Sequence, residues 1–376
     1  MDKKLVMAVA GSGKTYLICS SIDPEKRNLV LAFTHANIKN IHHELLRRFG
    51  FIPEKTIVST FHSFLFGDCI RPYHRMICNL YNAKFFACDG VMFLTPPQPM
   101  IGKRYNAMYV KDNKLKHYIP GTKYYCSHMA KLLIKNSSTL LPAVLNRANK
   151  FYDAIFIDEY QDYRNEEYEL LSAIIQGFKG DILLVGDYYQ HSVSGDNNSG
   201  KPFGTAKKPT PYHEYKRILG GLGVKIDETE LSKSRRCSKN VCDFVKTKMG
   251  IEIDSYDDHA GEVTKVTDIV EAERILCDDS ICKLLLRDSG KYLFSCSNWS
   301  YSKGDTYEKT CVILTSDTSN MMEDGFENDS IASITRNKLY VALTRSRTDV
   351  YLMPKDIFDQ IKDKYCKKYP EANTVI

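Results

Sequence analysis

Apolar and polar positions along the chain form two patterns that alternate. Short, mostly apolar runs occur at residues 5–9, 28–33, 153–157 and 181–185. Segments between them, such as 37–49, place apolar residues three or four positions apart. The first pattern is typical of buried strands and the second of amphipathic helices. Buried strands that alternate with helices predict a parallel sheet covered on both faces.

The same alternation resumes after about residue 218 and predicts a second, separate α/β unit. No sequence repeat links the two units. The elements expected here are helices at 238–249, 269–287, 331–345 and 355–365 and strands at 263–266, 292–296, 311–315 and 350–352.

Between the two parts of the first unit the alternation breaks down. Residues 71–125 are rich in Tyr, Pro, Asn and Lys, and the pairs Pro96-Pro97 and Pro120-Gly121 are turn signals. Residues 132–149 then have helical spacing. We therefore expect a first domain at 1–66 and 150–217, an insertion subdomain at 67–149 and a second domain at 218–376.

Composition narrows the class of protein. The chain has 376 residues, 43% apolar and 26% charged, which excludes global disorder. No apolar run approaches the ~20 residues of a membrane-spanning helix, and a short basic start followed by a Gly-rich turn is unlike a signal peptide. The net charge of +6 is compatible with a polyanionic partner. These features predict a cytoplasmic protein without a membrane partner.

The twelve cysteines contain no CxxC pair, and several stand in apolar contexts. This usage is typical of a reducing compartment, where cysteine acts as a small hydrophobe. A zinc site at Cys126 and His128 is the weaker interpretation, because structural zinc uses paired, closely spaced ligands.

The strongest chemical signal is AVAGSGKT at residues 8–15, between an expected strand and an expected helix. This is the context of a phosphate-binding loop, in which backbone N–H groups converge on phosphate oxygens. Lys14 would contact the β- and γ-phosphates and the Thr15 hydroxyl would bind Mg²⁺. Ala8 stands where a first glycine is usual. The predicted nucleotide-binding residues are Ala10, Gly11, Ser12, Gly13, Lys14 and Thr15.

A second signal is the acidic pair Asp158-Glu159 at the end of the apolar strand 153–157. Such a pair can hold Mg²⁺ through Asp158 and orient the attacking water through Glu159. Alone it could equally be a solvated helix N-terminus. The phosphate-binding loop expected on the same sheet favours the catalytic interpretation.

With these residues the chain resembles the UvrD-like superfamily 1 DNA helicases, of the UvrD, Rep and PcrA type. DEYQD at 158–162 is similar to the family's DExQD box, and six further stretches resemble its motifs in the family's order. They are THAN at 34–37, TFHS at 60–63, GDYYQ at 186–190, LSKSRRC at 231–237, SKGDTYE at 302–308 and LYVALTR at 339–345.

The resemblance implies two RecA-like domains, with ATP and Mg²⁺ bound in the cleft between them. It implies that Arg236 and Arg345 reach across the cleft to the phosphoryl group, and that Gln190 senses the γ-phosphate. The full set of expected site residues is catalytic Lys14, Glu159, Gln190, Arg236 and Arg345, nucleotide-binding Glu308, metal-binding Thr15 and Asp158, and nucleic-acid-binding Thr34, His35, Asn37, Thr60 and His62.

The chain also departs from the family pattern. Relatives read adenine with a glutamine motif upstream of the phosphate loop, and that motif is absent here. Only 65 residues separate Arg236 from Ser302, which leaves no room for the additional domain of large relatives. Where relatives stack bases on aromatic residues, this chain has His35 at one place and Val193 and Gly195 near the other. Tyrosines of the insertion could replace those aromatics, although local packing explains them as well.

Three functions stay open at this point. The first is a compact helicase that moves 3′ to 5′ along single-stranded DNA and separates duplex, in a bacterial, phage or viral setting. The second is an RNA helicase of compact viral type. The third is a regulatory or loading NTPase that binds DNA and a protein partner of replication, repair or recombination without unwinding.

Overall fold

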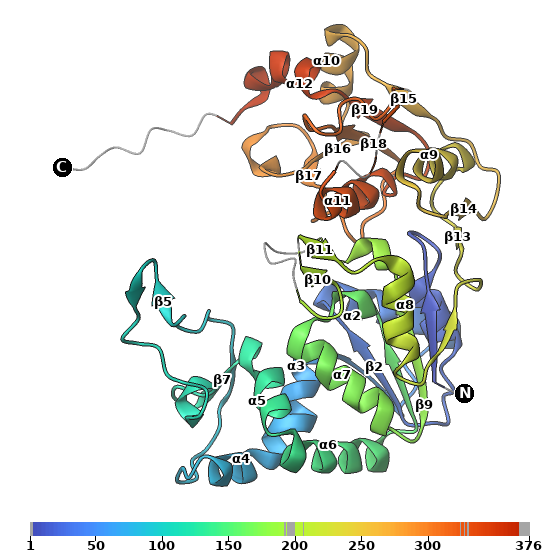
Figure 1. Ribbon diagram of the computed structural model, residues 1–376. Coiled ribbons are helices and arrows are strands. Elements are labelled where there is room, and N and C mark those ends of the chain that lie inside the picture. The colour runs from blue at the N-terminus through green and yellow to red at the C-terminus, as the bar shows by residue number, and fades with distance from the viewer. Residues whose placement is uncertain are drawn as a thin grey trace.

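Six parallel strands form the first sheet, in the order β12-β1-β9-β8-β2-β3. Figure 1 labels two of them, β2 and β9. The computed structural model describes residues 3–367 except 192, 194–199, 206, 324, 327, 329 and 330. The strands are β1 (Lys4–Met7), β2 (Asn28–Ala32), β3 (Thr56–Thr60), β8 (Ala154–Ile157), β9 (Asp181–Gly186) and β12 (Lys225–Asp227). The sheet thus extends past residue 218, where we expected the second domain to begin.

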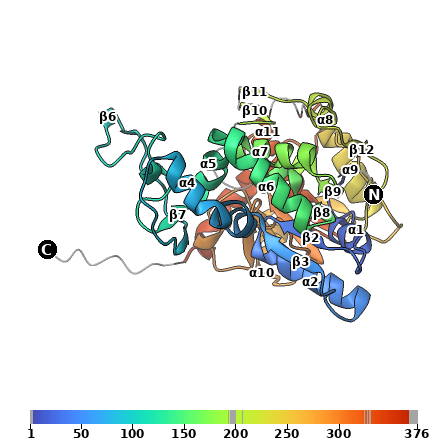
Figure 2. The same cartoon turned by 90° about the horizontal axis from the view of Figure 1, so that it is seen from below.

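Both faces of this sheet are covered, as the apolar runs predicted. Val6, Val30 and Phe156 pack against α1 (Lys14–Ser20) and α2 (His35–Phe49). Their neighbours along the strands, such as Leu5, Leu29 and Ile155, pack on the other face against α7 (Asn165–Gly177) and the insertion. Figure 2 shows α2 on one side of the strands and α6 and α7 on the other.

The insertion between β3 and β8 has little regular structure at its centre. A hairpin of β5 (Met100–Ile101) and β6 (Arg104–Tyr105) projects from the body of the molecule (Figures 1 and 2). The helix expected at 132–149 is two helices that meet at Asn136. The other elements are α3 (Phe61–Phe64), the π-helix Leu65–Ile70, α4 (His74–Leu80), β4 (Gly90–Met92), β7 (Lys123–Tyr125), α5 (Met129–Lys135) and α6 (Ser137–Phe151).

A second parallel sheet has the order β15-β19-β18-β16-β17. Its strands are β15 (Val263–Lys265), β16 (Ile281–Leu285), β17 (Cys296–Asn298), β18 (Lys309–Ile313) and β19 (Val350–Met353). The helices around it are α9 (Lys239–Met249), α10 (Ile269–Cys277), α11 (Ser333–Leu343) and α12 (Lys355–Ile361). Together with the first sheet, this confirms an α/β fold with two parallel-sheet units.

The prediction of a helix at 269–287 is wrong for the second half of that range. The helix α10 ends at Cys277, and Ile281–Leu285 is a wholly buried strand. Periodicity does not separate a short buried strand from a buried helix, and Lys283 made the run look amphipathic. Its ammonium group bonds the Asp278 carbonyl at 2.6 Å instead of reaching solvent.

Smaller elements connect the units. They are α8 (Tyr212–Gly220) and the short pairs β10 (Gly204–Thr205) with β11 (Lys208–Pro209) and β13 (Lys233–Ser234) with β14 (Asp254–Ser255). Across the described part of the chain, no helix has both the length and the apolar character needed to cross a bilayer.

Candidate active site

The phosphate-binding loop joins β1 to α1 and contains two glycines with positive φ. Gly11 has a φ of 72° and Gly13 a φ of 96°, backbone angles that residues other than glycine rarely adopt. A Cβ atom on Gly11 would also meet the Cβ of Arg236 at 2.6 Å. The loop therefore needs glycine at position 11 both for its own bend and because the second unit approaches it closely.

A cleft of about 790 Å³ lies between the two units and collects most of the expected site residues. The first unit contributes its phosphate-binding loop, the acidic pair and Gln190. The second unit contributes Arg236 and Arg345 from segments far apart in the sequence. The lining includes Gly11, Ser12, Gly13, Lys14, Thr15, Asn37, Asp158, Glu159, Asp162, Gln190, Arg235, Arg236, Lys303, Thr306, Arg345 and Arg347.

Asp158 is a buried carboxylate held in place by two donors. Asn37 Nδ2 donates to its Oδ2 at 3.1 Å, and the Glu159 backbone N–H donates to its Oδ1 at 3.0 Å. Burial and the neighbouring Glu159 raise the pKa of Asp158 to about 6. Two adjacent buried carboxyls gain from a cation, and the Asp158 and Thr15 oxygens are hard ligands of the kind that Mg²⁺ prefers. The donor set therefore fits magnesium.

Glu159 faces two lysines, one from each unit. Lys14 Nζ lies 3.2 Å from its Oε1, and Lys303 Nζ lies 3.5 Å from its Oε2. Burial raises the pKa of Glu159, but Lys14 and then Lys303 lower it by more than burial raises it. The net shift of the pKa is therefore downward. The carboxylate is therefore ionised at neutral pH and able to accept a proton.

Lys303 is a site residue that sequence reasoning missed. Its ammonium group crosses the cleft to Asp162 Oδ2 at 2.7 Å and is almost entirely enclosed. Burial lowers its pKa, but Asp162 and Glu159 outweigh that effect and raise it. Lys303 lies in the SKGDTYE stretch, which is recognisable as a motif in the sequence. The ion pair with Asp162 could not be predicted, because Asp162 is 141 positions away in the sequence.

The two arginines of the second unit lie side by side at the cleft. Arg345 donates Nε–H to the Val341 carbonyl at 2.9 Å, and Arg236 donates to Thr306 Oγ1 at 2.9 Å and to the Thr344 carbonyl at 3.0 Å. Among the described residues neither guanidinium forms a salt bridge. Burial, and then the charge of Arg236, lower the pKa of Arg345 to about 9. Two neighbouring cations without a carboxylate partner favour an anionic ligand.

A buried hydroxyl links the phosphate-binding loop to the second unit. The Ala10 backbone N–H donates to the Tyr340 hydroxyl at 2.9 Å, and that hydroxyl donates to Asp187 Oδ2 at 3.2 Å. Gln190 Nε2 donates to the same carboxylate oxygen at 2.8 Å. Tyr340 lies on α11, which leads directly to Arg345, so the helix and the loop are fixed relative to each other.

Three expected residues lie elsewhere than their assigned roles require. Ala10, expected at the nucleotide, is buried outside the cleft lining, and its backbone N–H donates to the Tyr340 hydroxyl. Glu308 is exposed and is not part of the cleft lining; its backbone carbonyl accepts bonds from Ser346 and Thr348. Asn37, expected at nucleic acid, bonds Asp158 inside the nucleotide cleft. It follows His35 by two residues in α2, about half a helical turn, which points its side chain away from the groove that His35 lines.

Thr34, His35, Thr60 and His62 line a second groove, of about 330 Å³, next to the cleft. Contact with Cys126 and the bond to Glu167 raise the pKa of His62 to about 10, so its ring is charged at neutral pH. Phe33 lines both this groove and the nucleotide cleft. An aromatic residue is therefore present beside the THAN stretch, and sequence reasoning missed it because Phe33 ends an apolar strand.

The other stacking positions and the zinc interpretation gain nothing from the structure. Val193 is buried and Gly195 lies outside the described residues. Of the insertion tyrosines, Tyr118 and Tyr124 are core residues, as the packing interpretation expected, whereas Tyr105 on the hairpin is 63% exposed and is not explained by packing. In the residues that the structure describes, no group of three or more His, Cys, Asp or Glu side chains could hold a metal ion.

Two protein-family models match the chain. Residues 2–196 match the model described as an AAA domain. Residues 126–354, more than half of the chain, match the model described as a viral superfamily 1 RNA helicase core domain. No curated protein matches it.

The similar solved structures include three structures of viral helicases, two of them of the same protein. Arterivirus nonstructural protein 10 (helicase) has a TM-score of 0.44 at 14% identity over 96% of this chain and 62% of its own. Its complex with DNA has a TM-score of 0.45 at 13% identity, with 96% and 63% covered. The PRRSV helicase has a TM-score of 0.44 at 11% identity over 98% of this chain and 56% of its own. The chain thus spans less than two thirds of the length of each.

Proposed function

Because this chain belongs to the superfamily 1 helicases, as a member of the family with the viral superfamily 1 RNA helicase core domain, we propose that it hydrolyses ATP in the cleft between its two units. We further propose that hydrolysis moves the chain along single-stranded nucleic acid and separates duplex. A match to the UvrD type within the superfamily rests on the sequence boxes alone.

The arginine pair is the observation that carries the hydrolysis proposal. Arg345 is 2% exposed and lines the cleft, and within the described residues its guanidinium donates hydrogen bonds only to neutral oxygens. A buried guanidinium is costly unless it meets a negative charge. A triphosphate bound by Lys14 supplies that charge and places it between the two units.

The other residues of the cleft then have distinct proposed roles. Phosphate oxygens compete with Glu159 for the Lys14 ammonium group, and a released Glu159 can orient water and accept its proton. Thr15 and Asp158 would hold Mg²⁺, which supplies neutralisation of the phosphate charge. Gln190 would report the γ-phosphate to the second unit, a role supported by its bond to Asp187, which also accepts a bond from Tyr340.

The distribution of charge supports nucleic acid as the partner. Residues 67–149 hold 12 of the 52 Lys and Arg residues but only 3 of the 46 Asp and Glu residues, a net charge of +9. The remainder of the chain carries −3. A basic element beside a groove that contains Phe33 and His62 is the arrangement expected for a phosphate backbone with unstacked bases.

DNA remains our first choice of strand because of the DEYQD and GDYYQ boxes, with 3′ to 5′ polarity taken from the same resemblance. RNA is the second candidate, favoured by the family model that matches residues 126–354. The arterivirus structure in complex with DNA is compatible with either.

Steady-state ATP hydrolysis tests the proposal, measured without nucleic acid, with single-stranded DNA and with single-stranded RNA. Stimulation by either strand, lost in Lys14→Ala, supports a nucleic-acid motor and identifies its track. Hydrolysis indifferent to both strands would contradict it and favour a switch that needs a protein partner.

Strand displacement on duplexes with a 3′ or a 5′ tail tests the motor itself. Displacement that requires the 3′ tail supports the proposed polarity. Stimulated hydrolysis without displacement from either tail would favour the regulatory or loading NTPase.

A further inference from the structure

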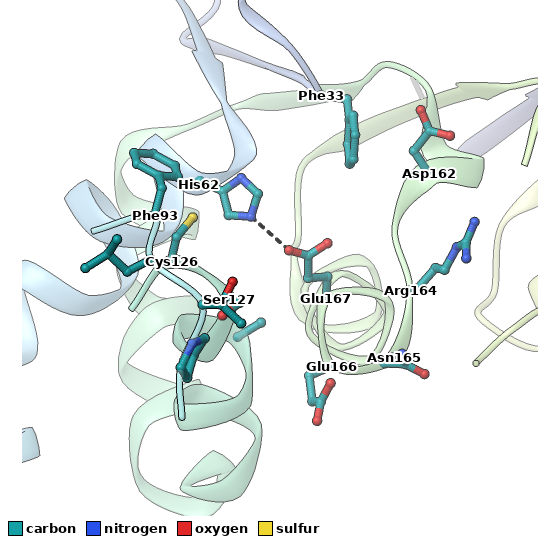
Figure 3. A pocket seen from close by; sticks show the side chains of 14 residues that line it. Phe33, His62, Phe93, Cys126, Ser127, Asp162, Arg164, Asn165, Glu166 and Glu167 are labelled. Atoms are coloured by element: carbon teal, nitrogen blue, oxygen red, sulfur yellow. Dashed lines mark hydrogen bonds and ion pairs between the residues drawn. The ribbon is translucent and has the colours of Figure 1, made fainter. Parts of the chain in front are cut away.

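A third cavity, of about 580 Å³, opens beside the groove and is distinct from the nucleotide cleft (Figure 3). Three aromatic rings from separate segments converge on it. Phe33 lies on one side, and His62 and Phe93 lie on the other, with Glu167 between them. This volume is within the range of small-molecule sites, so it can hold one nucleobase with its sugar.

Phe93 is the least expected of these side chains. It belongs to the insertion, just after β4, and is 84% exposed, although a phenylalanine of this size is normally buried. Phe33, by contrast, is held by an edge contact with Tyr163, with ring centroids 5.6 Å apart. The cavity therefore has one fixed aromatic wall and one that projects into solvent.

Glu167 supplies the polar group. It lies in the first turn of α7, and its Oε1 contacts His62 Nε2 at 2.9 Å. Within the described residues Oε2 has no hydrogen-bond partner, so it can accept one from a ligand. An ionised carboxylate only accepts hydrogen bonds, and it therefore selects ligands by the donors they present.

We propose that this cavity holds one unpaired base of the bound strand, packed against Phe33 and Phe93 as its aromatic walls, and that Glu167 Oε2 accepts a hydrogen bond from the exocyclic amino group of the base. Adenine, cytosine and guanine carry that group. Thymine and uracil offer only N3–H, which is flanked on both sides by carbonyl oxygens that repel a carboxylate. The strand is thus gripped more tightly at amino-bearing bases, an inference that rests on the proposed function and adds base selectivity to it.

Binding of fluorescein-labelled oligo(dC) and oligo(dT) of equal length, followed by anisotropy, tests the proposal on the full chain. These pyrimidine strands stack weakly on themselves, and their bases differ in the C4 substituent, the N3 proton and the C5 methyl group. Oligo(dC) should bind about tenfold more tightly than oligo(dT), which corresponds to the lower end for one hydrogen bond to a charged group. If RNA is the strand that stimulates hydrolysis, oligo(rC) and oligo(rU) replace them.

Two variants assign the effect to its residues. Glu167→Gln should reduce the preference to less than twofold, because an amide both donates and accepts, whereas Glu166→Gln removes the same charge from the same cavity and should keep it. Phe93→Ala should weaken binding of both strands about tenfold through lost stacking. Phe85→Ala is its control, since Phe85 is also an exposed residue of the insertion but does not line the cavity.

The outcomes separate this inference from the function beneath it. Equal binding of both strands, or equal effects of the Glu167 and Glu166 variants, would overturn the readout by Glu167. Unchanged affinity in Phe93→Ala would overturn the stacking. If either occurs while oligo(dT) still stimulates hydrolysis, the proposed function stands without the base pocket; if neither strand binds or stimulates, both fail.

Discussion

The nucleotide cleft and the insertion use charged residues in opposite ways. In the cleft, Lys14, Lys303 and Asp162 are largely enclosed and meet partners at fixed distances, and the pairs of Lys303 cross the boundary between the units. In the insertion, the basic residues of the projecting hairpin, Lys103 and Arg104, are exposed. Phosphoryl transfer requires fixed positions, whereas a flexible polymer can be held by charge and aromatic surface spread over a face.

The difference also decides what can be learned from one substitution. A cleft residue acts within a network whose members depend on one another, so its loss is large and not additive. An insertion residue contributes one of many similar contacts, so its loss is small. Four experiments, from the largest expected effect to the smallest, test whether the two regions behave in this way.

Loss of Lys14 or of Glu159, the proposed phosphate-binding and proton-accepting residues, should have the largest effect. Lys14→Ala should reduce ATP hydrolysis to background because the β- and γ-phosphates lose their cation. Glu159→Gln should still bind nucleotide but should not turn over, since an amide cannot accept the proton of water. Nucleotide binding by a fluorescent analogue and steady-state turnover check both; normal turnover in either variant would refute the assignment of the cleft.

Arg345→Ala should lower kcat about 10³-fold or more, if the guanidinium stabilises charge on the transferring phosphoryl group. Arg287→Ala is a matched control, because Arg287 is an exposed arginine of the same unit. Single-turnover hydrolysis at saturating ATP separates the chemical step from binding. A near-normal rate in Arg345→Ala would make this arginine structural.

The ion pair between Lys303 and Asp162 should contribute to stability as well as to the site. Lys303→Met leaves a buried carboxylate without its partner and should destabilise the chain by about 3 kcal/mol. Adding Asp162→Asn to that variant should restore part of the loss. Urea unfolding measures both, and equal midpoints for wild type and Lys303→Met would show that the two units do not depend on this pair.

The smallest effect is expected in the insertion. Lys103→Ala with Arg104→Ala should leave unstimulated ATP hydrolysis unchanged and reduce the slope of log affinity against log salt by about 1.4, the amount for two phosphate contacts on a single strand. Binding of oligo(dT) at several salt concentrations provides the slope. An unchanged slope would place the strand away from the hairpin.

The same contrast explains which parts of the molecule could be predicted from its sequence. The strand β8, the helix Asn165–Gly177 and the loop around Lys14 combine a clear apolar pattern with short motifs, and the structure has them where they were expected. Local rules suffice there because a buried parallel strand and its following turn are defined by neighbours in sequence.

Other features depend on partners distant in the sequence. The strands β5 and β6 have two residues each and carry no periodicity. Phe33 was assigned to a strand although its ring lines three cavities, and Lys303 gained its role only when the chain brought Asp162 to it. The turn of α2 that directs Asn37 to Asp158 is equally invisible to motif matching.

The charge concentrated in residues 67–149 has a consequence for how the molecule meets a strand. A body that carries +9 on residues 67–149 and −3 elsewhere is an electric dipole, and the field of a polyanion turns it before any contact forms. The insertion therefore arrives first and with a preferred face. Encounters that would fail by random tumbling then become productive. The uneven charge distribution therefore increases the association rate more than it increases the final affinity.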